Sequence, residues 1–231
     1  FGALGVSTSG DQYLPRRSGP LPRLGDVNEI QELVRKVKAN EELPEHTRRL
    51  LAPGVTMGGL RPKGLIEIDG EQWVVKFRDE DPWDTPLIEH ACMTLAKKAA
   101  ITVSLTKAVS LREGHAIAIK RFDRQSNHRI HAQSARVALR AEGSEMGYPE
   151  LAQLLRRRAP TSNGSAQSQM KELFKRMIFN ILMDNTDDHE RNHVLLMDDA
   201  QHLSLSPAFD VLPTGQSLGY QQMRVGKDRN D

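Results

Sequence analysis

The hydrophobic pattern of the chain changes its period near residue 123, and this change constrains the fold more than any other feature. Before it, short runs rich in β-branched and aromatic residues flank turn signals, of which Asp69-Gly70 is typical of a tight hairpin. Beyond it, apolar residues recur at helical spacing, and the longest such stretch covers 166–183. This order predicts an α+β fold that is strand-rich over 1–122 and mainly helical over 123–231.

The same patterns predict individual elements. Asp26, with Glu29 at the spacing of a capping box, predicts the start of a helix that runs to residue 37. The apolar face of 166–183 is broad, which predicts a buried central helix. The other expected elements are helices over 45–51, 85–99, 133–140 and 149–158 and strands over 65–68, 73–77, 103–111, 115–122, 194–197 and 203–205.

Composition narrows the class of protein. Of the 231 residues, 38% are apolar and 27% charged, as in globular rather than disordered chains. The formal net charge of +2 does not indicate a nucleic-acid surface, and the single cysteine, Cys92, cannot form an internal disulfide. No apolar run approaches the ~20 residues of a membrane span, and no signal-peptide pattern is present. We therefore expect a cytoplasmic protein without membrane contact.

The most specific motif lies near the C-terminal end. Asp187 is followed five residues later by Asn192, and Asp210 comes after a gap of hairpin length. In a kinase, one carboxylate orients or deprotonates the acceptor hydroxyl, while an amide and a second carboxylate hold magnesium on the nucleotide phosphates. The alternative is an ordinary polar turn after a helix. The second carboxylate and the apolar helix before the motif favour a kinase site.

A zinc site is a competing hypothesis for the same segment. His189, Glu190 and His193 form the His-Glu-x-x-His pattern of zinc hydrolases, which requires both histidines on one helical turn. The residues 185–188 are poor helix formers, the run after His193 is typical of a strand, and no third ligand follows at a known spacing. We therefore expect the zinc hydrolase to be the weaker alternative.

Phosphate-binding candidates lie in the first half of the chain. Glycine-rich backbone can approach phosphate oxygens, and nearby cations add charge, as in the run Gly58, Gly59, Leu60, Arg61, Pro62 and Lys63. Lys76 lies in an apolar strand pattern, where a lysine needs a partner such as a phosphate or Glu89 of the next helix. The alternative for the glycine-rich run is a plain surface turn. Lys76 could instead face solvent, and Glu89 could lie on a solvated helix face.

Taken in order, these motifs resemble the HipA family, the kinase toxins of bacterial type II toxin–antitoxin systems. The resemblance runs from about residue 54 to the end of the chain. It is carried by 56–63, Val75-Lys76, 119–124, 148–152, 185–189 with Asn192, and 206–210.

The resemblance implies a two-lobed, protein-kinase-like fold related to lipid kinases, with a nucleotide held between the lobes. It also implies ATP and magnesium as cofactors and transfer of the γ-phosphoryl group to a protein serine or threonine. By the same resemblance, Asp187 is the catalytic base and Asn192 and Asp210 hold magnesium. The nucleotide contacts that it implies are 58–63 and Lys76 at the phosphates, Lys120, Arg121 and Phe122 at the adenine, and Asp188, His189 and Phe209.

Regulation and partners are expected from the same family. Family members phosphorylate a serine just before the glycine loop, which ejects the loop, and Thr56 stands at the matching position here. A HipB-like antitoxin is the expected partner, with DNA contacted only through it, and the protein substrate is not specified. A non-catalytic, kinase-like scaffold that binds an antitoxin is the alternative. The joint presence of Asp187, Asn192, Asp210 and Lys76 favours the enzyme.

Overall fold

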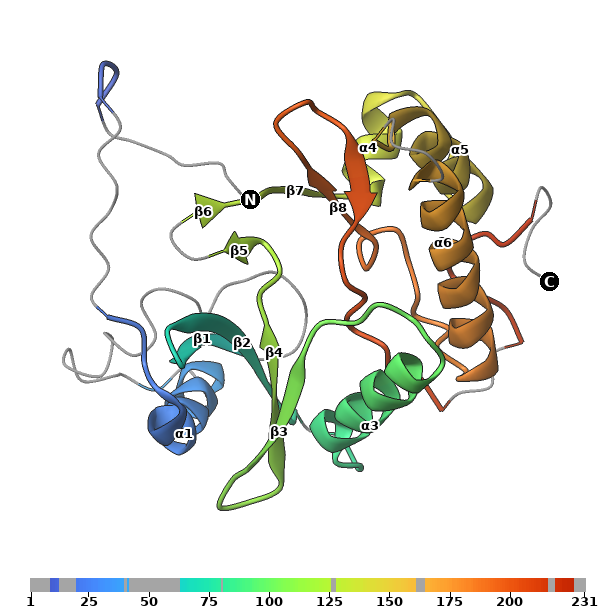
Figure 1. The fold of residues 1–231 in the computed structure, drawn as a ribbon. Coiled ribbons are helices and arrows are strands. Elements are labelled where there is room, and N and C mark those ends of the chain that lie inside the picture. Colours follow the sequence, from blue (N-terminus) through green and yellow to red (C-terminus); the bar gives the residue numbers. More distant parts are fainter. Residues whose placement is uncertain are drawn as a thin grey trace. The chain divides into compact units, whose positions relative to one another are not determined.

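The computed structural model describes residues 9–12, 20–39, 41, 63–79, 81–125, 128–160, 165–215 and 219–226 (Figure 1). These residues belong to two compact units. One, here called the sheet unit, contains the described residues of 5–91 and 105–126. The other, here called the helical unit, contains the described residues of 92–104 and 127–226.

The sheet unit is built on four antiparallel strands in the order β1-β2-β4-β3. They are β1 Lys63–Ile68, β2 Glu71–Phe77, β3 Thr106–Ser110 and β4 His115–Lys120. The expected hairpin at Asp69-Gly70 is confirmed, and both residues have positive φ angles of 53° and 75°. Positive φ at both central residues is what a type I′ turn requires, and this turn matches the twist of the strands that it joins.

Helix α1, Val27–Lys38, packs its apolar face on this sheet (Figure 1). Its Val27, Ile30 and Val34 share one buried cluster with Ile66, Trp73, Val75, Phe77 and Ala118 of the strands. A 3-10 turn, Leu24–Asp26, precedes the helix. The side chain of Asp26 accepts from the Arg23 amide at 2.7 Å and does not cap α1, so the expected capping box with Glu29 is wrong.

The helical unit contains α4 Ala135–Ala141, α5 Tyr148–Arg158 and α6 Ser165–Leu182, with α5 and α6 side by side (Figure 1). A three-stranded antiparallel sheet joins β7 His131–Ser134, β8 Val194–Met197 and β9 Leu203–Leu205. One apolar cluster of its core includes Leu139, Leu151, Leu155, Leu173, Leu195 and Leu203. Helix α3, Thr85–Lys98, begins in the sheet unit and ends in the helical unit, and the short strands β5 Arg124–Gln125 and β6 His128–Arg129 follow β4.

Several expected elements need correction. The helix expected from residue 133 starts at Ala135, because Gln133 and Ser134 pair with β8 instead, and Ser134 caps the helix through the Val137 amide. The strand expected over 103–111 is limited to β3, and Val103 forms an isolated parallel bridge with Ala208. The helix expected over 45–51 lies outside the described residues.

Helix α6 is not the buried central helix that its composition predicts. It buries one face through Leu173, Arg176 and Asn180, whereas Phe174 is 59% and Leu182 78% exposed. None of the helices that the structure describes is both long and apolar enough to cross a membrane.

Candidate active site

Lys76 and Glu89, which the sequence indicates as a pair, form an ion pair in the sheet unit. The Lys76 Nζ lies 2.8 Å from Glu89 Oε1, and the two side chains are 11% and 6% exposed. Lys76 comes from β2 and Glu89 from the first half of α3, and Lys63 at the start of β1 pairs in register with Lys76. Gly58, Gly59, Leu60, Arg61, Pro62 and Thr56 lie outside the described residues.

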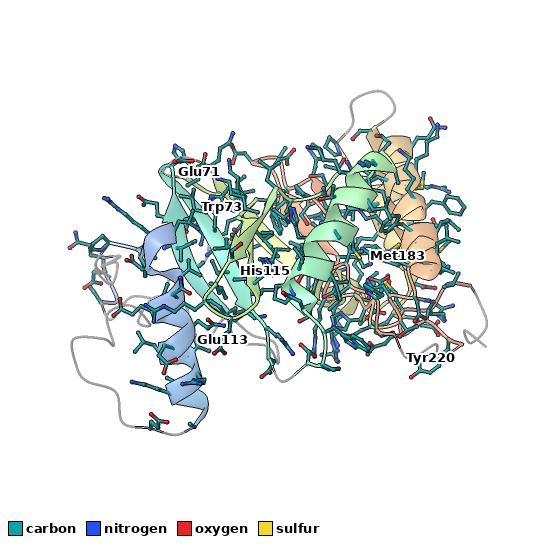
Figure 2. The ribbon with its side chains drawn as sticks, turned by 90° about the horizontal axis from the view of Figure 1, so that it is seen from below. Glu71, Trp73, Glu113, His115, Met183 and Tyr220 are labelled. Carbon is teal, nitrogen blue, oxygen red and sulfur yellow. The ribbon has the colours of Figure 1, made fainter. Side chains whose placement is uncertain are left out.

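The residues expected at the adenine follow the end of β4. Lys120 Nζ is 3.2 Å from Glu71 Oε1 at the start of β2, where Figure 2 labels Glu71. Arg121 donates two hydrogen bonds to the Asp123 carboxylate, at 2.9 and 2.7 Å, and its amide donates to Gln72 O. Phe122, between them, is half-buried.

The pKa of Asp123 reflects this arrangement. Burial acts to raise the pKa, but the hydrogen bonds and charge of Arg121, together with the charge of Arg124, outweigh it and hold the pKa below its ordinary value. The carboxylate therefore stays ionised and keeps both arginines in place at the end of the strand.

In the helical unit, the segment after α6 folds as a series of turns rather than as a helix. Asp187 is exposed, while its neighbour Asp188 is only 2% exposed. The backbone N–H of Asn192 donates to the backbone oxygen of His189 at 2.9 Å, and β8 begins at Val194. The one helical turn that the zinc hypothesis needs between His189 and His193 is thus not formed.

Buried polar side chains surround Asp188. Tyr148 donates its hydroxyl hydrogen to Asp188 Oδ2, and His193 Nε2 donates to Oδ1 at 3.0 Å. Asn180 Nδ2 lies 3.4 Å from the Tyr148 hydroxyl, and Asn185 Nδ2 donates to Asn180 Oδ1 at 3.1 Å. Burial, followed by the charge of Asp188, raises the pKa of Tyr148 well above its ordinary value, so the phenol remains a donor.

The segment that bears Asp210 is anchored separately. Ala208 exchanges backbone hydrogen bonds with Thr102 and Ser104, at 2.8 and 2.9 Å. The buried guanidinium of Arg176 donates to Ser206 O at 2.8 Å and to Glu172 Oε1 at 3.0 Å. Burial lowers the pKa of Arg176, and the charge of Glu172 opposes that shift.

Asp210 itself has a positive φ of 60°, a conformation that residues with a side chain adopt rarely and that often marks functional sites. A pocket within the helical unit is lined by Asn192 and Asp210 together with Phe209 and Asp188. Asp187 does not belong to its lining. The structure therefore brings the expected amide and second carboxylate to one pocket and leaves Asp187 outside its wall.

Among the residues that the structure describes, no three His, Cys, Asp or Glu side chains are grouped so as to hold a metal ion. His193, one of the two histidines of the zinc hypothesis, is hydrogen-bonded to Asp188 instead.

Sequence reasoning did not single out Arg176 and Asn180, and it included Tyr148 and Asn185 in the motifs without giving either a role. A signal was present for Arg176 and Asn180, because they follow Leu173 at the helical spacing of three and seven residues and so share a face with an apolar side chain. Polar residues on an apolar helical face need buried partners, which is an indication of a polar cluster in the core.

Comparison with known proteins agrees with the motifs. The family model of the HipA-like C-terminal domain matches residues 55–231. Over 161 residues the chain is 29% identical to the Sinorhizobium fredii protein named "Putative kinase Y4dM". The aligned region covers 63% of this chain and 38% of the relative. The chain thus spans less than half the length of that relative.

Two solved structures are similar. The first is HipA in the Shewanella oneidensis MR-1 complex of HipA, HipB and operator DNA, with a TM-score of 0.68 and 17% identity over 96% of this chain and 57% of that one. The second is the Helicobacter pylori proinflammatory kinase CtkA, with a TM-score of 0.52 and 16% identity over 69% of this chain and 56% of that one. These likenesses confirm the predicted α+β, kinase-like fold.

Proposed function

Because the chain belongs to the HipA family, whose C-terminal domain model covers most of its length, we propose that it is an ATP- and magnesium-dependent protein serine/threonine kinase. The observation that carries this proposal is the pocket shared by Asn192 and Asp210. An amide oxygen and a carboxylate are suitable ligands for magnesium, whose octahedron nucleotide phosphates and water complete. Magnesium would neutralise charge on the phosphates during transfer.

Asp187 is the group that we propose to orient or deprotonate the acceptor hydroxyl. Its side chain is exposed, and it makes no side-chain hydrogen bond to another residue in the described parts of the chain. An exposed and uncommitted carboxylate can accept a hydrogen bond from an incoming hydroxyl, whereas Asp188 is buried with both oxygens occupied. The two neighbouring aspartates therefore have different tasks.

Lys76 is proposed to bind the nucleotide phosphates. A lysine that is 11% exposed and held by Glu89 has a restricted position, and its ammonium has the charge and the donors that suit phosphate oxygens. The family resemblance extends the proposed nucleotide contacts to 58–63, Lys120, Arg121, Phe122, His189 and Phe209.

The partner and the regulation that we propose are inferred from related proteins. The Shewanella oneidensis HipA was solved with HipB and operator DNA. We propose an antitoxin of that kind as the partner of this chain, with DNA reached through the antitoxin. Thr56, before the glycine loop, is the proposed site of self-phosphorylation.

The test is transfer of label from ATP, in magnesium, to dephosphorylated casein and to the protein itself. Asp187→Asn is expected to lower transfer by about a hundredfold or more, because a positioned base contributes roughly that factor. Thr56→Ala is expected to lose self-labelling and to retain transfer to casein.

Asp199→Asn, which changes an exposed aspartate of the β8–β9 turn, is the matched control. Transfer by Asp187→Asn at the level of this control would contradict the role of Asp187. No transfer by the wild type, with no binding of magnesium–ATP, would favour the scaffold alternative.

A further inference from the structure

We propose that Tyr148, Asp188 and His193 form a positioning network, which holds Asp187 and Asn192 in the geometry that phosphoryl transfer requires. The inference rests on the proposed function, and it gives Asp188 a structural task in place of nucleotide contact. All three side chains lie in the helical unit, and the residues are 5%, 2% and 3% exposed.

The positions of the three residues in the sequence are the first argument. Asp188 directly follows Asp187, and His193 directly follows Asn192. The hydrogen bond from His193 Nε2 to Asp188 Oδ1, 3.0 Å long, therefore joins the two ends of the segment that bears both proposed functional residues. A shift of either end moves one of them, because each is one peptide bond away from a network member.

The second argument is that the network is anchored on both sides. Tyr148 is the first residue of α5, and its hydroxyl fixes Asp188 Oδ2. From the other side, the Met223 amide donates to Asp188 O at 2.9 Å. The ring of Tyr148 also meets that of His193 edge to face, with centroids 5.3 Å apart. The segment is thus tied to a helix and to a distant part of the chain.

The third argument concerns the cost of burial. A buried carboxylate is costly unless both oxygens are hydrogen-bonded, and here both are. An apolar residue at 188 would avoid that cost if the position served packing alone. The ordinary pKa of a tyrosine, 10.0, already lies above the neutral range and that of Tyr148 is raised further, so the phenol keeps its hydrogen and donates. A segment that bears both the proposed base and a proposed magnesium ligand needs such fixed, directional contacts.

The first experiment compares Tyr148→Phe with Tyr220→Phe, which removes the hydroxyl of a tyrosine that is 50% exposed and labelled at the edge of the helical unit in Figure 2. With casein as the acceptor, Tyr148→Phe is expected to lower kcat about 10- to 100-fold, as loss of groups that orient ligands does elsewhere. The KM for ATP is expected to change by less than kcat, because Lys76 and Asp210 lie outside the network. Tyr220→Phe is expected to behave like the wild type.

The second readout is amide hydrogen exchange, which does not depend on activity. In Tyr148→Phe, exchange is expected to rise by about tenfold or more over 185–193, because the loop loses an anchor. Exchange over 63–77 in the sheet unit is expected to stay unchanged. A general loss of stability would raise exchange in both peptides.

His193→Gln and His193→Leu provide a further pair. The glutamine amide can still donate to Asp188 and is expected to recover most of the kcat that the leucine variant loses. If Tyr148→Phe fails to fold, this pair decides the question with the same two measurements.

Two results would overturn the inference, provided that the wild type transfers label. One is a kcat of Tyr148→Phe equal to that of Tyr220→Phe, and the other is unchanged amide exchange over 185–193 in Tyr148→Phe. A leucine variant as active as the glutamine variant would overturn it as well. A wild type that transfers no label is a different outcome, since it refutes the proposed kinase and the catalytic part of the inference together.

Discussion

The two units place their buried polar groups differently. In the sheet unit the core beneath α1 is apolar, and the ion pair of Lys76 and Glu89 lies apart from that cluster. In the helical unit a chain of polar side chains runs through the interior, with Tyr148, Asp188 and His193 at its centre. Apolar packing alone defines a stable sheet, whereas buried polar groups cost stability and also restrict geometry. Such groups concentrate where the proposed chemistry requires restricted geometry.

The largest difference in stability is expected between variants of two neighbouring aspartates, Asp188 and Asp187. Asp188→Ala leaves the Tyr148 hydroxyl and His193 Nε2 without their acceptor, at a cost of about 3–5 kcal/mol. Asp187→Ala changes an exposed side chain and is expected to cost less than about 0.5 kcal/mol. Urea unfolding of both variants measures the difference. Equal losses would show that burial does not separate these residues.

The ion pair of the sheet unit gives the next effect. Lys76→Met leaves the Glu89 carboxylate buried without its cation, and we expect a loss of about 2–3 kcal/mol because the pair retains some exposure. The double variant Lys76→Met, Glu89→Leu is expected to regain most of that stability while it remains inactive. Thermal unfolding and label transfer measure the two properties separately. Recovered activity in the double variant would remove Lys76 from the proposed phosphate site.

The smallest effect is the dependence of stability on pH, which differs between the units. The pKa of Asp123 in the sheet unit is lower when folded, so its contribution is present at neutral pH. This stabilising contribution is lost as the pH falls below the ordinary pKa of 3.8 and then through the lower pKa of the folded protein. The pKa of Tyr148 in the helical unit is higher when folded, so its contribution is present below 10.0 and is lost as the pH rises beyond that value.

Unfolding measured at both extremes tests this assignment. Asp123→Asn is expected to reduce the loss of stability in acid alone, and Tyr148→Phe the loss in alkali alone. An acid response that Asp123→Asn leaves unchanged would place the acid-sensitive group elsewhere.

Local patterns predicted much of the fold. Asp69-Gly70 identified the β1–β2 hairpin, and apolar spacing located α6 to within one residue at each end. Both depend on interactions between residues that are close in sequence. The boundary between β7 and α4 was misplaced, because Gln133 and Ser134 are paired with β8, some sixty residues further along the chain. The exposed face of α6 was misjudged for a similar reason, since periodicity identifies an apolar face but not what packs against it.

The candidate site divides in the same way. The order and spacing of Asp187, Asn192 and Asp210 are properties of the sequence, and they were sufficient to indicate a kinase before any contact was known. That Asp188 is buried while Asp187 is exposed depends on Tyr148, forty residues earlier in the chain, and on Met223 beyond it. Burial is a consequence of long-range packing, so adjacent residues of the same type acquired different environments when the chain folded.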